Sequence, residues 1–359
     1  MPTYASPQAL KDDWADYQDK HPNVRIRNAA DALGVSEAEL LATGCGAHVT
    51  RLQDSWKDLL KELHALGPVM ALTRNDAAVH EKTGRYEEVS FSKTHNMGLA
   101  LADEIDLRLF MDHWALGFAV ETPWNGGRGG LRRSFQFFDA SGTAVHKVFL
   151  TRKSDLDVYA GLVEKYRSDD QSIDQPVTPY EPDDVPTPLD SIDVEGFLAE
   201  WRALEDTHDF FPLLRSYDVS RTQAMQIGEG EFTHRVSPSS ARQTLQRAAD
   251  RDAPIMVFVG NRGCLQIHTG PVNTLKATPP WYNVLDPGFQ LHLNEEEIAA
   301  AWVVKKPTRD GTVTSLELHD TEGGIIARFF GKRKPGEPER KDWRAIVETL
   351  MRDEASVHV

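Results

Sequence analysis

The pattern of apolar and polar positions predicts blocks of helix alternating with blocks of short strands. Residues 9–66 follow a mostly helical spacing, whereas residues 67–149 form short apolar and alternating runs typical of buried and half-buried strands. Residues 154–168 return to helix, because apolar residues recur there at the spacing of one helix face. The first part of the chain therefore predicts a helical lead, an antiparallel sheet and a closing helix.

The helical lead contains a predicted glycine turn followed by a predicted helix start. Residues 28–41 are predicted as helix, glycine turn and helix, with Ser36 and Glu39 in the spacing of a capping box. Helix-turn-helix DNA readers share this pattern. The acidic balance of the chain instead favours a small packing unit.

The same order of elements recurs in the second part of the chain. The matched segments keep their order with only small shifts, and they pair residues 68–72 with 254–258, 105–109 with 289–293, 118–123 with 302–307, and 134–139 with 315–320. We therefore predict an α+β fold made by tandem duplication, each half a large antiparallel β-sheet with flanking helices.

A proline-rich acidic stretch separates the two copies. The predicted organisation is an N-terminal repeat over residues 1–167, a linker over 168–191 and a C-terminal repeat over 192–359. Ligands usually bind between domains, so a cleft between the two halves is the expected ligand site.

Composition limits the classes of function. The formal net charge of −15 argues against a nucleic-acid partner, because such partners need clustered cations. No apolar run of membrane-spanning length and no secretory signal is found, so no membrane insertion is expected. Cys45 and Cys264 make neither a disulfide framework nor a zinc spacing. These features favour the reducing cytoplasm.

His208 is the candidate metal ligand. It lies among two phenylalanines and two leucines, with Asp206 and Asp209 on either side. A heme iron needs one neutral imidazole nitrogen and apolar surface for the porphyrin. On the residues alone, a packed histidine at a helix start is the commoner explanation.

Positions at which the copies differ in charge are candidates for function. Glu121 and Thr122 of the first copy correspond to Lys305 and Lys306 of the second. Strand alternation points the two lysines to opposite faces, and Lys306 shares its face with Trp302. Lys306 could pair with the carboxylate of a ligand. A solvated surface cation is the alternative.

Two arginines are further candidates. Arg333 follows a strand of the second copy, and its neighbours Lys332 and Lys334 are expected to be surface cations. Arg108 lies inside an apolar strand, where an unpaired guanidinium is costly to bury. It therefore needs either a cleft or a carboxylate partner such as Asp106.

Longer segments resemble a known family. The chain resembles the cytoplasmic heme-utilisation proteins of Gram-negative bacteria, called hemin-degrading factors or hemin transport proteins, over nearly its whole length. The segments that carry the resemblance are residues 206–211, 266–272, 281–287, 302–308 and 329–336.

The resemblance implies a cofactor and its contacts. It implies heme b (iron protoporphyrin IX) in the cleft between halves, with His208 as the proximal ligand and Arg108 as the distal, catalytic donor. It also implies propionate contacts from Lys306 and Arg333 and a cofactor contact from Phe329. The chain departs from the family at residue 212, where Pro212 replaces a glycine and restricts the turn after His208.

The resemblance implies heme degradation by oxidative opening of the porphyrin ring, which releases iron. No dinucleotide fingerprint is found, so a separate reductase would supply electrons. The alternative is a non-catalytic carrier that delivers heme to a separate heme oxygenase. A heme-uptake transporter is a further expected partner, and His268 and His292 are the next candidates for the iron ligand.

Overall fold

A computed structural model describes residues 4–124, 128–181, 186–334 and 336–357. The chain forms two compact units: unit 1 contains residues 1–74, 81–181 and 260–266, and unit 2 contains residues 75–80, 182–259 and 267–359. The chain changes unit within β3 (Ala78–Gly84) and again around β12 (Cys264–Gly270). The repeat boundaries predicted at residues 167 and 192 remain predictions about the sequence. Residues 1–3, residues 182–185 of the predicted linker and residue 335 of the last family segment lie outside the described residues.

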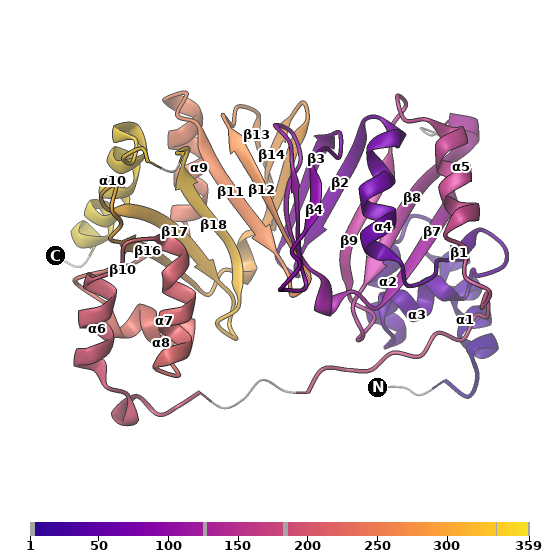
Figure 1. Cartoon of the computed structure of the whole chain (residues 1–359), viewed down its shortest axis with the longest axis horizontal. Coiled ribbons are helices and arrows are strands. Elements are labelled where there is room, and N and C mark those ends of the chain that lie inside the picture. The colour runs from indigo at the N-terminus through magenta and orange to yellow at the C-terminus, as the bar shows by residue number, and fades with distance from the viewer. Residues whose placement is uncertain (1–3, 125–127, 182–185, 335, 358–359) are drawn as a thin grey trace. The chain divides into compact units, whose positions relative to one another are not determined.

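Unit 1 opens with helices and continues as antiparallel sheet (Figure 1). Its helices are α1 (Pro7–Lys20), α2 (Ile26–Leu33), α3 (Glu37–Ala42), α4 (Trp56–Glu62) and α5 (Leu156–Lys165). Hydrogen-bonded neighbours run in the order β1 (Val49–Arg51), β7 (Leu116–Pro123), β8 (Leu131–Phe138), β9 (Ala144–Leu150) and β2 (Val69–Arg74). A second antiparallel group contains β4 (Val89–Phe91), β5 (Met97–Leu101) and β6 (Asp106–Phe110).

Alternation along the strands gives unit 1 two buried faces. Ala119 and Phe135 pack in one cluster with Leu59 of α4. Phe118, the residue before Ala119, packs in another cluster with Leu41 of α3. Because successive side chains of a strand point to opposite faces, helices cover the sheet on both sides.

Unit 2 repeats this arrangement (Figure 1). Its helices are α6 (Val194–Arg202), α7 (Phe210–Ser216), α8 (Arg221–Ile227), α9 (Ser240–Asp250) and α10 (Lys341–Val357), and the 3-10 turn η5 (Thr207–Asp209) precedes α7. Hydrogen-bonded neighbours run in the order β10 (Thr233–Val236), β16 (Ala300–Lys306), β17 (Val313–His319), β18 (Ile325–Gly331) and β11 (Ile255–Gly260). A second antiparallel group contains β13 (Leu275–Thr278), β14 (Trp281–Asp286) and β15 (Phe289–Asn294).

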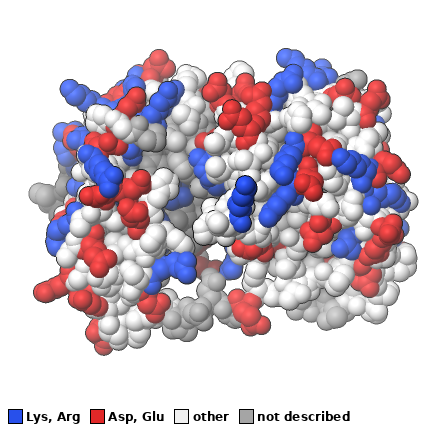
Figure 2. All heavy atoms as spheres, in the orientation of Figure 1, with Lys and Arg blue, Asp and Glu red and all other residues white. Residues whose placement is uncertain are grey.

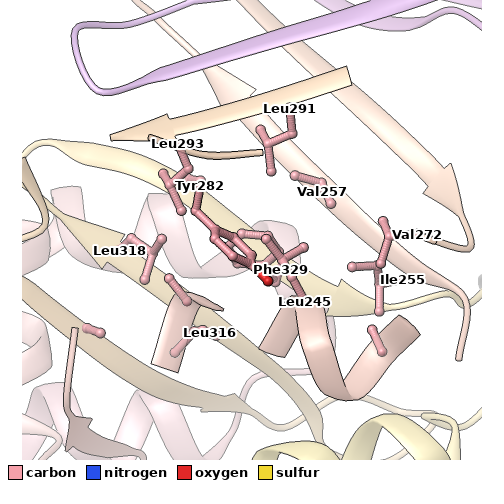
Figure 3. Close-up of a cluster of buried hydrophobic side chains, with 14 of the residues drawn as sticks. Leu245, Ile255, Val257, Val272, Tyr282, Leu291, Leu293, Leu316, Leu318 and Phe329 are labelled. Atoms are coloured by element: carbon pink, nitrogen blue, oxygen red, sulfur yellow. The ribbon is translucent and has the colours of Figure 1, made fainter. Parts of the chain in front are cut away.

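The main core of unit 2 lies between its sheet and the α9–α10 side. Phe329, Leu316 and Leu318 pack there with Leu245 of α9 (Figure 3). On the opposite face, Trp302 packs with residues of α6, α7 and α8. That opposite face is the one that Lys306 shares with Trp302, as alternation predicts.

In each unit, the helix that precedes the first strand begins with a capping box. Ser36 and Glu39 form the predicted capping box at the start of α3, and Ser220 and Gln223 form another at the start of α8. In addition, α3 contributes Leu41 to the core, as a packing unit should. The predicted α+β fold with two sheet-containing halves and flanking helices is confirmed.

The charged surface is mixed. Figure 2 shows Lys and Arg side chains interspersed with Asp and Glu over the visible face. Among the described residues, no helix combines the length and apolar character needed to cross a membrane.

Candidate functional site

His208 lies in η5, immediately before α7, and its side chain is 93% exposed. Its Nδ1 is 2.6 Å from Oδ1 of Asp206, and its backbone N–H donates to the same oxygen at 2.8 Å. An ionised carboxylate only accepts hydrogen bonds, so Nδ1 is the donor, and in the neutral imidazole the lone pair is then on Nε2. This arrangement fixes the ring and presents one nitrogen to a metal.

Asp206 is a functional candidate that the sequence did not single out from Asp209. The pKa of Asp206 is lowered, chiefly by the backbone N–H of His208, then by its imidazole, and further by the charge of Arg333. Asp206 is therefore a stable anion that polarises the imidazole. Arg333 lies close enough to act on it, and its Nη2 is 3.5 Å from Oδ2 of Asp310.

Apolar surface adjoins His208. Phe211 is 62% exposed, an unfavourable state for a phenyl ring in water unless another molecule covers it. Pro212 is the third residue of α7, where a backbone N–H has no intrahelical partner. The proline that the sequence marked as a departure is therefore accommodated without loss of a helical hydrogen bond.

A charge cluster with a buried centre, formed by Lys306 and Glu317, lies on the sheet face beneath α7. We define it as Lys306 of β16, Glu317 of β17, Arg328 of β18 and Arg221 of α8. Nε and Nη2 of Arg221 each donate to one carboxylate oxygen of Glu317, both at 2.8 Å. Nζ of Lys306 is 3.5 Å from Oε1 of Glu317. Glu317 and Arg328 are directly paired across the strands.

Phe210 connects this cluster to the His208 segment. The ring of Phe210, the first residue of α7, has its centroid 4.5 Å from Nζ of Lys306 and 5.3 Å from the guanidinium carbon of Arg221. Both are cation–π distances. Because Phe210 follows His208 by two positions, the segment that carries the imidazole is held against the cations.

Burial shifts the ionisation of this cluster. It lowers the pKa of Lys306 to about 7, since the attraction of Glu317 offsets the loss of water only in part and Arg221 and Arg328 oppose a further positive charge. Burial alone would raise the pKa of Glu317, but Arg221 and Lys306 outweigh it and hold that pKa well below its usual range. The cluster therefore keeps a carboxylate and two guanidiniums, with a lysine poised to titrate.

The equivalent place in unit 1 is electrically neutral. Glu37, the first residue of α3, pairs with Lys147 of β9, and Gln136 stands opposite Lys147 across the strands. These positions match Arg221, Arg328 and Glu317 of unit 2, and Thr122 replaces Lys306. With Lys306 protonated, the unit 2 cluster holds three cations and one carboxylate. In that state the defined cluster carries two more positive than negative charges, whereas its described counterpart in unit 1 is balanced.

Arg108 and Phe329, the other predicted site residues, both have partners within the protein. Arg108 of β6 pairs through Nη1 with Asp106 and also donates to the carbonyl of Leu107 at 3.2 Å. This is the carboxylate pairing considered as the alternative to a cleft, and the side chain remains 32% exposed. Phe329 is fully buried in the main core of unit 2 (Figure 3), so the structure gives it a packing role. Its contact with a cofactor remains a prediction.

The other candidate ligand histidines are engaged within the protein. His268 stacks on Phe289 with ring centroids 3.7 Å apart, and its Nε2 is 3.2 Å from the carbonyl oxygen of Pro271. Nδ1 of His292 is 2.6 Å from Oδ1 of Asn283. His208 is far more exposed than the buried His268.

Two hollows in unit 1 lie apart from these residues. One of about 720 Å³ is lined by an acidic rim that includes Glu87, Glu88 and Glu104. The other, of about 310 Å³, lies beside α5 and is lined by the ion-paired Glu121 and Arg133. Neither is lined by a residue that the sequence selected for the site.

The fold and site together define a class: a duplicated α+β protein that presents an oriented imidazole beside buried cations. The family described as the Haemin-degrading HemS.ChuX domain matches residues 34–166 and again residues 218–350. The chain belongs to this family, and the double match confirms the tandem duplication.

Known proteins are similar over nearly the full chain. It is 38% identical over 334 residues to the hemin transport protein HmuS of Yersinia pestis, covering 92% of this chain and 94% of that protein. Holo-PhuS, a heme-binding protein from Pseudomonas aeruginosa, matches with a TM-score of 0.92 and 44% identity, over 96% of this chain and 99% of that one. The heme-degrading enzyme ChuS of Escherichia coli O157:H7 matches with a TM-score of 0.88 and 34% identity, over 96% and 100% of the chains.

Proposed function

We propose that this chain is a heme-binding protein of hemin utilisation, and that unit 2 holds heme b through Nε2 of His208. The observation that carries the proposal is the exposed imidazole whose Nδ1 is tied to Asp206. A carboxylate–histidine pair is the usual support of a metal-bound imidazole. The similar proteins support the same ligand, since HmuS is a hemin transport protein, PhuS a heme-binding protein and ChuS a heme-degrading enzyme.

The residues present fit an iron porphyrin. Phe211 offers exposed apolar surface next to His208, as a flat macrocycle requires. Heme b also carries two propionates, and with Lys306 protonated the three cations of the unit 2 cluster exceed its one carboxylate, Glu317, by two charges. Arg333 lies near Asp206 and adds a further cation on the His208 side. The cations on this side of unit 2 therefore have the sign that ligand carboxylates require.

We further propose that the chain degrades heme with Arg108 as the distal donor. Bound heme would supply the oxidative chemistry that opens the porphyrin and releases iron. A guanidinium has N–H donors and no acceptor, so Arg108 can donate hydrogen bonds but is a poor iron ligand. Its pairing with Asp106 holds the guanidinium while Nε and Nη2 donate to no acceptor among the described residues.

This function requires partners. A separate reductase would supply the electrons and a heme-uptake transporter the substrate, in the cytoplasm. The alternative role is a carrier that delivers heme to a separate heme oxygenase. The exposed setting of His208 serves a carrier equally well, because an accessible ligand is also easily exchanged.

The proposed function is tested by titrating the purified chain with hemin. We expect one hemin per chain and a histidine-ligated absorption spectrum. His208→Ala should bind more weakly and lose that spectrum, since the axial nitrogen is gone. His292→Ala is the matched control and should behave like the parent. Retention of the parent spectrum in His208→Ala, with its loss in His292→Ala, would move the ligand to His292.

A further inference from the structure

Lys306 is a buried amine in a crowded set of charges. It is 4% exposed, and its ammonium faces Glu317 with Arg221 and Arg328 near enough to repel it. On the same side of the sheet, β17 also brings His319, whose Nε2 is 3.9 Å from Oε2 of Glu317. The strand β10 brings Arg235 beside Trp302, and α7 places the ring of Phe210 against the lysine.

We propose that the capture of a ligand carboxylate at this cluster takes up one proton, which binds to Lys306. The inference rests on the proposed function in that the propionates of heme are the carboxylates concerned. In the balanced step, the neutral amine of Lys306 and one proton from solvent become an ammonium, while the ligand carboxylate remains ionised. No redox partner is involved.

The geometry explains why the proton arrives with the ligand. One carboxylate, Glu317, is shared among two guanidiniums and one amine, and the bidentate pairing with Arg221 occupies both of its oxygens. A second carboxylate against the cluster would offset the guanidinium charges that disfavour an ammonium at Lys306. Removing like-charge repulsion raises the pKa of a buried amine.

The sign of the pH dependence follows from the lowered pKa of Lys306. Below a pH of about 7 the amine is already protonated in the free protein, so ligand capture takes up little. Above that pH the free amine is mostly neutral, and capture must bring a proton. Affinity therefore falls as pH rises above 7, by up to about tenfold per pH unit for a single coupled proton.

Unit 1 shows what the cluster would be without this property. Its Lys147 has Glu37 as a direct partner, and the place of Glu317 is taken by the neutral Gln136. The unit 1 pair is one cation and one anion, so it leaves no charge for a ligand to complete. The coupling is thus specific to unit 2.

The experiment measures proton uptake with a porphyrin that lacks iron. Protoporphyrin IX carries the two propionates but makes no bond to His208. Isothermal titration of the full chain at pH 8, in buffers that differ in ionisation enthalpy, gives the number of protons taken up per porphyrin. We expect about one for the parent, and a fall toward zero at pH 6.

Variants identify the group that titrates. Lys306→Arg carries a permanent charge, so it should bind with no proton uptake and with a nearly flat affinity from pH 6 to 9. Lys306→Met should also lose the uptake. His319→Gln and the exposed Lys332→Met are matched controls that should keep it. Uptake that survives in Lys306→Arg but disappears in His319→Gln would overturn the assignment to Lys306.

The outcomes separate this inference from the proposed function. Suppose that hemin binds through His208 and that the protein takes up no proton when either hemin or protoporphyrin IX binds. That result would refute the inference and leave the proposed function intact. Proton-coupled capture of protoporphyrin IX, together with hemin binding that ignores His208→Ala, would refute the assigned ligand and leave the inference intact.

Discussion

At the scale of single residues, the orientation of His208 depends on Asp206. The sequence identified His208 and a carboxylate on each side, but it could not choose between them because the choice depends on side-chain direction in a turn. The structure selects Asp206, which accepts from both the ring and the backbone of His208. Asp209 is exposed and makes no side-chain cap to α7.

Asp206→Asn is the corresponding prediction. An amide oxygen without charge polarises the imidazole less, so hemin affinity should fall by about 10–100-fold, the usual effect of removing such a support. Equilibrium titration with hemin gives the value. Asp209→Asn is the control and should bind like the parent, whereas an equal loss in both variants would mean that overall charge, rather than the hydrogen bond, is responsible.

The burial and the charged partners of Lys306 could not be predicted from the sequence. Alternation placed it correctly on the face of Trp302, but the sequence treated it as either a pocket cation or a surface cation. It is neither exposed nor alone, because Glu317 faces it from the next strand and Arg221 from α8 shares that carboxylate. Arg221 and Glu317 are 96 positions apart, so only the fold reveals the cluster.

At the scale of elements, strong local signals were sufficient for much of the fold. Apolar alternation predicted most strands of the main sheets, and Ser36 with Glu39 predicted the start of α3. Shorter and more polar elements were missed: β4 and β13 at the ends of their strand groups, and α9, which has a narrow apolar stripe. Their stability comes from tertiary pairing and packing, which no local pattern reports.

The two capping boxes allow a matched prediction. Ser220→Ala removes the side chain that accepts the N–H of Gln223 at 3.2 Å, and Ser36→Ala does the same for Glu39 in unit 1. Each should destabilise the protein by about 0.5–2 kcal/mol, measured by denaturant unfolding. Because Arg221 follows Ser220 directly, only Ser220→Ala should also weaken hemin binding. Equal binding losses in the two variants would disconnect α8 from the site.

At the scale of the whole molecule, the repeat was predictable and the compact units were not. Matched segments reveal a duplication in sequence, and the family matches twice. Residues 75–80 of the first copy nevertheless belong to unit 2, and residues 260–266 of the second copy belong to unit 1. Sequence similarity between copies contains no information on which copy a strand end packs against.

An Arg108 variant distinguishes an enzyme from a carrier. Arg108 belongs to unit 1 and His208 to unit 2, so this test involves residues of both units. If the chain degrades heme, Arg108→Ala should bind hemin nearly normally and lose about 10²–10³ in rate, the usual cost of one charge-stabilising donor. The measurement is heme loss and iron release with ascorbate or a reductase, with catalase present. Degradation that catalase abolishes in the parent would favour the carrier.

The central claim is that Nε2 of His208 is the protein ligand of the heme iron. Its most direct test is the absorption spectrum of hemin bound to His208→Gly, recorded before and after imidazole is added. Glycine leaves space for the missing ring, so we expect an altered spectrum that added imidazole returns to that of the parent. A His208→Gly complex that already has the parent spectrum, and that imidazole does not change, would contradict it.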